Sequence, residues 1–155
     1  TPGLRIFEKY AFKCGGGVNH RMGLYDAAMI KENHIAWTDN LNSAVKRIRL
    51  NSPFTTHVII EAENIEQAKE AVLAGADSIL LDELSPETIK KNVQELRDLS
   101  MNSLKKEVNK NLIIEVSGIN PQEISKYLIK GIDLISTSSS ITKSNWIDLS
   151  MRYIN

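Results

Sequence analysis

Short apolar runs alternate with amphipathic segments along most of the chain. The amphipathic segments repeat apolar residues at helical spacing, as in Leu41, Val45 and Ile48, which predicts helices that bury one face. The apolar runs are rich in β-branched residues and predict five strands, at residues 27–30, 57–62, 78–82, 111–118 and 132–136. Apolar residues at successive positions are typical of parallel strands covered on both faces. The pattern therefore predicts an α/β fold built from parallel βα repeats.

Capping residues mark where the predicted helices begin. An N-cap side chain accepts a hydrogen bond from the first turn, and proline fits the first helical position. Residues that can start a helix in these ways occur at Pro2, Thr38 or Asp39, Asn64, Ser85-Pro86 and Asn120. In the first helix, Leu4, Phe7, Tyr10 and Ala11 recur at helical spacing. A last helix is expected to begin near Trp146, and residues 100–110 are predicted as a helical extension or a loop.

Polar side chains follow the predicted strands at or just past their carboxyl ends. They are Lys31, Glu61, Asp82, Ser117 and Ser138. In a (β/α) barrel these strand ends ring one mouth, where barrel enzymes keep their chemistry. An open doubly wound sheet would gather only the residues at its switch point. Because five strands are too few to close a barrel, the chain is predicted to form part of an incomplete (β/α) barrel.

Composition excludes several classes of protein. The 155 residues carry 19 basic and 19 acidic side chains without a basic stripe, so no nucleic-acid partner is expected. No apolar run approaches the roughly 20 residues that span a bilayer, so no membrane segment is expected. The single cysteine, Cys14, excludes an internal disulfide and favours a reducing, cytoplasmic location. We interpret Cys14 as a bystander thiol rather than a nucleophile.

The first candidate site is a glycine-rich loop with cationic neighbours. Residues 15–17 are consecutive glycines, whose backbone N–H groups could approach a ligand closely. His20 and Arg21 follow at once, and Lys31 and His34 follow the first strand. This set suits a small anion with more than one carboxylate or phosphate. The alternative is a solvated loop followed by an ordinary strand.

Two carboxylates form the second candidate site. Glu61 and Asp82 lie at equivalent ends of consecutive strands, so they could share a hydrated Mg²⁺ or grip a pair of sugar hydroxyls. Glu63 is the main rival to Glu61. The alternative is that each carboxylate caps the following helix or pairs with a lysine.

Two late turns rich in small residues form a third candidate site, for phosphate. They contain Ser117-Gly118 and residues 136–140. Small residues allow backbone N–H groups to meet a phosphate near a helix N-terminus, and late barrel loops often do so. The alternative is that these are ordinary turns.

Two blocks of sequence identify a family. Gly15-Gly-Gly-Val-Asn-His-Arg21 and Ile30-Lys-Glu-Asn-His34 closely resemble quinolinate phosphoribosyltransferase. The resemblance covers nearly the whole chain and continues through Glu61-Ala-Glu-Asn64, Ile79-Leu-Leu-Asp82, Glu115-Val-Ser-Gly118 and Ile141-Thr-Lys-Ser144. It implies an incomplete α/β barrel that joins quinolinate to phosphoribosyl pyrophosphate with Mg²⁺. The products would be nicotinate mononucleotide, CO₂ and pyrophosphate, on the de novo route to NAD.

By matched position, the resemblance also implies roles for individual residues. His20, Arg21 and Lys31 would hold the quinolinate carboxylates, and Glu61 and Asp82 would engage the ribose hydroxyls and Mg²⁺. The 5′-phosphate would bind at Ser117, Gly118, Ser138, Ser139 and Ser140. Ser117-Gly118-Ile119 is one residue shorter than the usual family loop. Lys143 replaces a family histidine in the late turn and can still serve a phosphate as a point charge.

The resemblance further implies parts that precede this sequence. A Thr-Arg-Lys-Thr block, a first barrel strand and an N-terminal sandwich domain would come before Thr1. We therefore expect the 155 residues alone to be poorly active, and the whole protein to form a homodimer or larger oligomer. Three alternatives remain: a non-catalytic relic, a paralogue acting on another base, and a Schiff-base aldolase with Lys31 as nucleophile.

Overall fold

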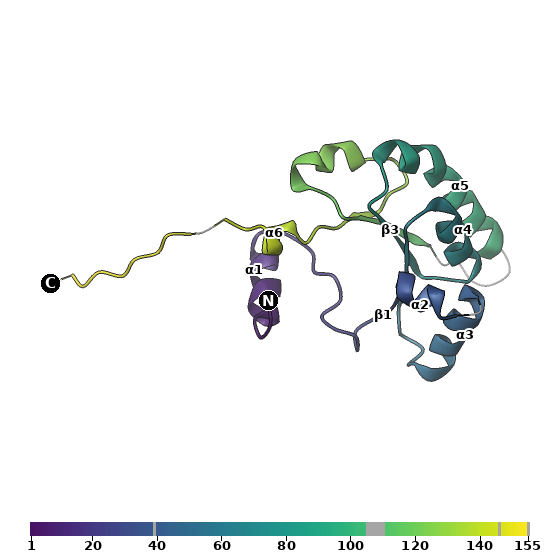
Figure 1. Cartoon of the computed structure of the whole chain (residues 1–155), viewed down its shortest axis with the longest axis horizontal. Helices are drawn as coiled ribbons and strands as arrows, with labels where there is room; N and C mark the ends of the chain where they lie inside the picture. The colour runs from purple at the N-terminus through teal and green to yellow at the C-terminus, as the bar shows by residue number, and fades with distance from the viewer. Residues whose placement is uncertain (39, 105–110, 146, 155) are drawn as a thin grey trace.

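Five parallel strands form one sheet and lie side by side in chain order (Figure 1). The computed structural model describes residues 1–38, 40–104, 111–145 and 147–154. The strands are β1 (Ala28–Ile30), β2 (Val58–Ala62), β3 (Ser78–Asp82), β4 (Ile113–Ser117) and β5 (Leu134–Ile135). An open doubly wound sheet reverses its strand order at a switch point, whereas the sheet of the described residues runs from β1 to β5 in sequence. The predicted part of a (β/α) barrel is therefore confirmed.

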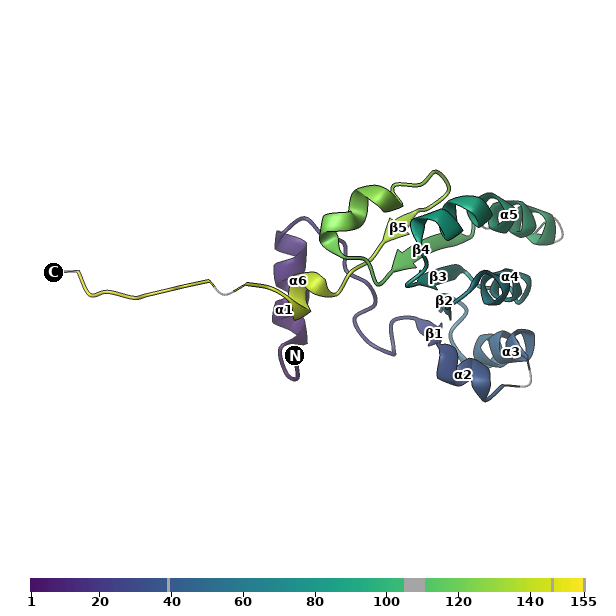
Figure 2. The ribbon, with the colours of Figure 1, turned by 45° about the horizontal axis from the view of Figure 1, so that its top comes forward.

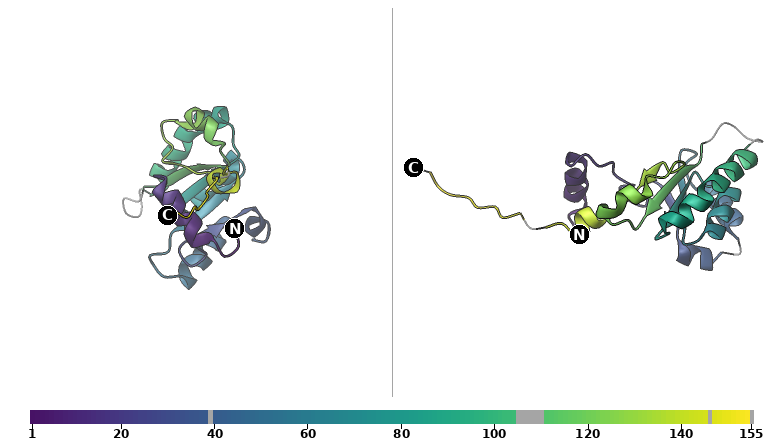
Figure 3. Two further views of the ribbon diagram at one scale, coloured as in Figure 1. Left: turned by 90° about the vertical axis from the view of Figure 1, so that its left-hand side faces the viewer. Right: turned by 90° about the horizontal axis from the view of Figure 1, so that it is seen from above.

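The helices lie on two sides of this sheet. Figure 2 shows α3 (Leu41–Asn51), α4 (Ile65–Leu73) and α5 (Pro86–Leu104) stacked side by side along one face. α1 (Arg5–Cys14) and α6 (Ser139–Thr142) lie together away from that layer, beyond the carboxyl ends of the strands (Figure 3). Two short helices, α2 (Glu32–Ala36) and the 3-10 helix η1 (Pro121–Tyr127), follow β1 and β4. Among the described residues, no helix combines the length and apolar character that crossing a membrane requires.

The pairing register separates an apolar face of the sheet from a partly polar one. Ile30, Ile60, Ile79 and Ile114 form one row across β1 to β4, and they are buried in the core beneath the helices. Burial of each such side chain contributes about 1.5–3 kcal/mol. The neighbouring row, on the opposite face, contains Glu61, Leu80 and Glu115. The helical layer thus stabilises the fold and leaves the other face for chemistry.

Helix α1 turns its polar side toward the sheet. Arg5, Glu8, Lys9 and Phe12 share one helical face and line the cavity described below. Leu4, Phe7 and Tyr10 of the predicted apolar stripe are exposed. The predicted helical spacing is correct, although these apolar residues are not buried. The reason is that α1 stands over the polar ends of the strands rather than in the helical layer.

Several helix ends differ from the sequence prediction. Asn40 caps α3 by accepting the Ser43 N–H, because the Thr38 hydroxyl is donated back to the Ile35 carbonyl at the end of α2; Asp39 lies outside the described residues. Pro2 precedes α1 in a turn. The last helix is α6, and residues 147–154 follow without helical structure. Trp146 and residues 105–110 lie outside the described residues, whereas residues 100–104 do extend α5.

Two arginine–aspartate clamps join successive βα units at the amino ends of the strands. Arg49 of α3 donates to Asp77 Oδ2 (2.7 Å), and the same oxygen accepts the Val58 N–H at the start of β2 (2.6 Å). Arg97 of α5 and Asp133 repeat the arrangement around the Ile114 N–H of β4. The arginines also donate to the carbonyls of Gly75 and Gly131, each two residues before its aspartate. Each clamp therefore ties a helix and its strand to the start of the next strand.

We expect Asp77→Asn to lower the free energy of unfolding by about 2–4 kcal/mol, because it removes a buried charge that binds both Arg49 and the Val58 N–H. Urea unfolding would show a lower midpoint with an unchanged slope. Asp133→Asn, at a half-exposed carboxylate, should cost less than Asp77→Asn. Glu123→Gln, which removes a surface pair with Lys126, should leave the midpoint where it is. Equal midpoints for wild type and Asp77→Asn would contradict a stabilising role for the Asp77 clamp.

Candidate active site

Most of the candidate residues line one cavity of about 820 Å³ at the carboxyl ends of the strands. Its wall is formed by the strand ends, the polar face of α1 and the two late turns. The sequence-predicted members are His20, Arg21, Lys31, Glu61, Asp82, Ser117, Gly118, Ser138, Ser139, Ser140 and Lys143. Residues from different βα units therefore converge on a single opening.

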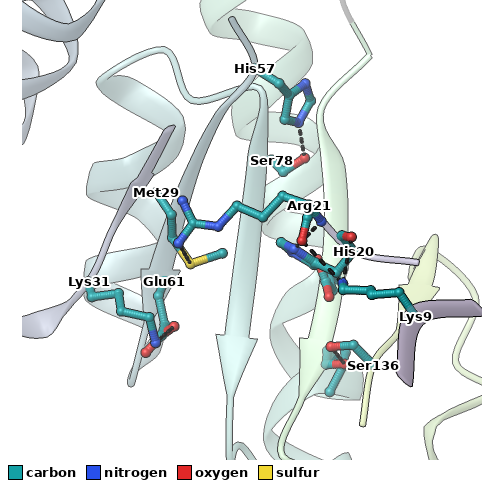
Figure 4. Close-up of polar contacts among 11 residues, drawn as sticks. Lys9, His20, Arg21, Met29, Lys31, His57, Glu61, Ser78 and Ser136 are labelled. Carbon is teal, nitrogen blue, oxygen red and sulfur yellow. Dashed lines mark hydrogen bonds and ion pairs between the residues drawn. The ribbon is translucent and has the colours of Figure 1, made fainter. Parts of the chain in front are cut away.

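Lys31 and Glu61 form an ion pair on one wall of the cavity (Figure 4). Ile30 pairs with Ile60 in the sheet, so the residues that follow them lie side by side, and Lys31 Nζ is 2.7 Å from Glu61 Oε2. The hydrogen bond that Lys31 donates to Glu61 raises the pKa of Lys31 above its ordinary value, although partial burial acts in the opposite direction. The raised pKa favours a protonated Lys31, which does not suit a Schiff-base nucleophile.

Glu61 and Asp82 face the cavity at different depths. Glu61 pairs with Leu80, whereas Asp82 lies two residues farther along β3 and pairs with Ser117. The expectation that the two carboxylates occupy equivalent positions on their strands is therefore wrong, because Asp82 lies two residues beyond the partner of Glu61. Glu63 lies past the end of β2 and is exposed. It is not among the cavity-lining residues, which leaves Glu61 as the β2 carboxylate.

These two carboxylates suit a hydrated Mg²⁺ rather than an enclosed metal. Among the described residues, no group of three or more His, Cys, Asp or Glu side chains could hold a metal ion. Mg²⁺ is commonly bound through one or two carboxylates, with water and substrate phosphates completing its coordination. Glu61 and Asp82 offer that number of carboxylates on adjacent strands.

Lys9 of α1 fixes the loop that carries the His20-Arg21 pair. Its Nζ donates to the carbonyl oxygens of His20 (2.8 Å) and Arg21 (3.1 Å). Asn19 donates from Nδ2 to the Lys9 carbonyl (3.0 Å). These contacts span α1 and the loop, and Figure 4 shows Lys9 beside the pair. Lys9 is a site residue that the sequence interpretation missed.

The Arg21 side chain reaches across the polar face of the sheet toward β1 (Figure 4). Its guanidinium donates from Nη1 to the Ala27 carbonyl (2.8 Å), and Nη2 lies 3.6 Å from Met29 Sδ. A guanidinium has five N–H donors, so these contacts orient it without using all of them. Arg21 therefore presents an oriented positive charge to the cavity.

The consecutive glycines end α1 instead of binding a ligand. The N–H groups of residues 15, 16 and 17 donate to the carbonyls of Ala11, Lys13 and Phe12. None of these glycines is among the cavity-lining residues, which begin again at Val18. The prediction that glycine N–H groups approach the ligand is therefore wrong, since helix termination already uses them.

His20 lies between the backbone of Arg21 and the side chain of Glu115. The Arg21 N–H donates to His20 Nδ1 (2.8 Å), and His20 Nε2 is 3.6 Å from Glu115 Oε2. Glu115 is only 4% exposed. Burial pushes its pKa up, but the hydrogen bonds from His20 and Ser136 outweigh that effect and hold the pKa below its ordinary value. Glu115 was also missed, although a lone carboxylate within an apolar strand was the available signal.

The two late turns meet the cavity in different ways. Glu83, which follows β3, adopts a left-handed backbone (φ 52°) and donates its N–H to the Ser117 carbonyl (3.3 Å). Gly118 packs directly against it. In the second turn, Ser138 precedes α6 and Lys143 follows it. This brings hydroxyls and a cation to the side of the cavity opposite Lys31.

We expect Gly118→Ala to destabilise the protein by about 2 kcal/mol, because Gly118 has a left-handed backbone (φ 76°) and an added Cβ would lie 2.9 Å from Glu83 Cγ. Gly75→Ala is the matched control. Its φ is 81° and nothing lies within 4 Å of the added Cβ, so it should cost only about 1 kcal/mol. Thermal unfolding measures both, and equal losses would contradict the crowding at Gly118.

The family described as "Quinolinate phosphoribosyl transferase, C-terminal domain" matches residues 1–152. The chain is 42% identical over 152 residues to the probable nicotinate-nucleotide pyrophosphorylase [carboxylating] of Methanothermobacter thermautotrophicus, covering 97% of this chain and 52% of that protein. It is 37% identical to the Synechocystis protein of the same name, covering 99% of this chain and 50% of that protein. The crystal structure of NadC from Streptococcus pyogenes superimposes with a TM-score of 0.75 and 39% identity, over 93% of this chain and 46% of that one.

The chain thus spans about half the length of the curated relatives it matches. The family match extends over residues 1–152, and the superposition covers 93% of this chain. The chain therefore belongs to the quinolinate phosphoribosyl transferase family and corresponds to its C-terminal domain.

Proposed function

We propose that the longer protein containing this chain joins quinolinate to phosphoribosyl pyrophosphate, forming nicotinate mononucleotide, CO₂ and pyrophosphate for NAD biosynthesis. The main support is that cations, carboxylates and small late turns from separate βα units line one cavity. The relatives' name, nicotinate-nucleotide pyrophosphorylase [carboxylating], describes the same conversion in reverse. The protonated state of Lys31 argues against the alternative of a Schiff-base aldolase.

In this proposal, Arg21 and Lys31 bind the two carboxylates of quinolinate, and His20 lines the same pocket. A substrate carboxylate would compete with Glu61 for Lys31, since both are anions at hydrogen-bond distance from one ammonium. The exchange would release Glu61 toward the ribose hydroxyls. The positive charges would also stabilise the negative charge left on the pyridine ring when CO₂ departs.

Glu61 and Asp82 would hold the ribose hydroxyls and Mg²⁺, the ion that neutralises charge on the departing pyrophosphate. Their negative charges favour a ribose that becomes positive as the glycosidic bond to pyrophosphate breaks. Ser117 and Gly118, with Ser138, Ser139, Ser140 and Lys143, would receive the 5′-phosphate. Lys143 supports this assignment because a flexible ammonium can pair with phosphate as a point charge.

Two features bear on the setting of the whole protein, which we propose to be a cytoplasmic homodimer or larger oligomer. The exposed apolar residues of α1 are suited to an interface outside this chain. The single, free cysteine is compatible with a reducing compartment.

We expect Lys31→Met in the whole protein to weaken quinolinate binding at least about tenfold, because a charged hydrogen bond to the ligand is lost. Isothermal calorimetry measures this directly. Lys69→Met is the matched control, since Lys69 also pairs with a glutamate, Glu95, but on the helical layer. An unchanged affinity in Lys31→Met, or an equal loss in both variants, would exclude Lys31 as a ligand-binding residue.

The number of carboxylates that the pocket accepts can be measured with two ligands. We expect quinolinate to bind at least about tenfold tighter than nicotinate, because nicotinate has one carboxylate and leaves either Arg21 or Lys31 without an anionic partner. Calorimetric titration of both ligands checks this expectation. Tighter binding of nicotinate would favour a paralogue with another substrate.

A further inference from the structure

The two nitrogens of His20 face groups of opposite character. On one side, the Arg21 backbone N–H points at Nδ1 from 2.8 Å. A backbone N–H can only donate, so Nδ1 must be the unprotonated, accepting nitrogen. On the other side, Nε2 faces a Glu115 oxygen at 3.6 Å. An ionised carboxylate can only accept, so Nε2 must carry the proton.

This pattern is satisfied only by a neutral imidazole with its proton on Nε2. A doubly protonated ring would place a second N–H at Nδ1, directly against the Arg21 N–H, and the 2.8 Å hydrogen bond would be lost. The alternative neutral tautomer would set two donors together at Nδ1 and two acceptors together at Nε2.

The loop around His20 is held firmly enough to preserve this geometry. Lys9 binds the carbonyls of both His20 and Arg21, which fixes the backbone that carries the Arg21 N–H. Glu115 is on the central part of β4, nearly buried, and also accepts from Ser136. Neither neighbour of the imidazole is therefore a mobile surface side chain.

We propose that Glu115 is a positioning residue that orients the His20 ring by facing its Nε2 proton, while the Arg21 N–H donated to Nδ1 selects the neutral imidazole. His20 then shapes the quinolinate pocket without contributing a positive charge. The inference rests on the proposed function for the identity of the ligand. It assigns the two carboxylates of the dianion to Arg21 and Lys31, and it differs from the expectation that His20 also holds a carboxylate.

Two variants of Glu115 in the whole protein separate these possibilities by the sign of their effect. Glu115→Gln keeps a carbonyl oxygen that can accept the Nε2 proton and removes a negative charge beside a pocket for a dianion. Quinolinate should therefore bind about two- to fivefold tighter. Glu115→Ala leaves the Nε2 proton without its acceptor, so the ring loses its orientation and binding should weaken several-fold. If His20 were a cation supported by Glu115, both variants would bind quinolinate more weakly.

The protonation of the two ring nitrogens of His20 can be measured without any ligand. The chain has three histidines, and a His20→Gln variant of the whole protein identifies the His20 signals in ¹⁵N NMR spectra. We expect an unprotonated Nδ1 and a protonated Nε2 in wild type and in Glu115→Gln. Two protonated nitrogens in wild type at neutral pH would overturn the proposal.

Glu63→Gln supplies the control for the change of carboxylate to amide. Glu63 is exposed and is not part of the cavity wall, so this variant should bind quinolinate as wild type does. A wild-type protein that shows the expected tautomer but does not bind quinolinate would refute the proposed function and leave the His20 assignment intact. Weaker quinolinate binding by Glu115→Gln would refute the assignment.

Discussion

The pairing register of β2, β3 and β4 is the constraint on which the site depends. Because side chains alternate between the faces of a strand, the register that buries Ile60, Ile79 and Ile114 also turns Glu61 and Glu115 toward the cavity. A slip of one residue would carry these carboxylates into the apolar core and expose the isoleucines. The hydrophobic effect thus selects the register, and the register positions the chemistry. The same pairing places Asp82 beside Ser117 and so joins the two regions proposed for ribose and phosphate.

The stabilising interactions and the cavity occupy opposite ends of the strands. The Asp77 and Asp133 clamps join helices to the amino ends of the strands, while the cavity lies at the carboxyl ends. This separation allows the cavity to hold features that a core could not tolerate. They include an ion pair between Lys31 and Glu61 and a left-handed Glu83. In barrel enzymes generally, stability at one end and variation at the other allows one fold to support many reactions.

Local sequence patterns predicted the strands and the part of the cavity wall that the strand ends and the late turns form. Apolar β-branched runs and polar residues at strand ends are short-range signals, and they were enough to bring Lys31, Glu61 and Asp82 to one opening. Contacts between distant residues were not predicted. Arg97 and Asp133 are 36 positions apart, and Lys9 acts on carbonyl oxygens that sequence does not distinguish. The polar orientation of α1 was missed for a similar reason, since helical spacing identifies two faces of a helix but not which face meets the rest of the molecule.

β5 differs from the other strands in how little holds it. It has two residues, Leu134 and Ile135, which pair with Glu115 and Val116 of β4, and Leu134 is substantially exposed. Local opening is easiest where few apolar contacts and few ladder hydrogen bonds must break. The last βα unit should therefore be the first part of the sheet to exchange its amide protons with solvent. The turn at residues 138–143 follows this strand closely in the chain. A phosphate bound at the turn would therefore also slow the exchange of the β5 amide protons.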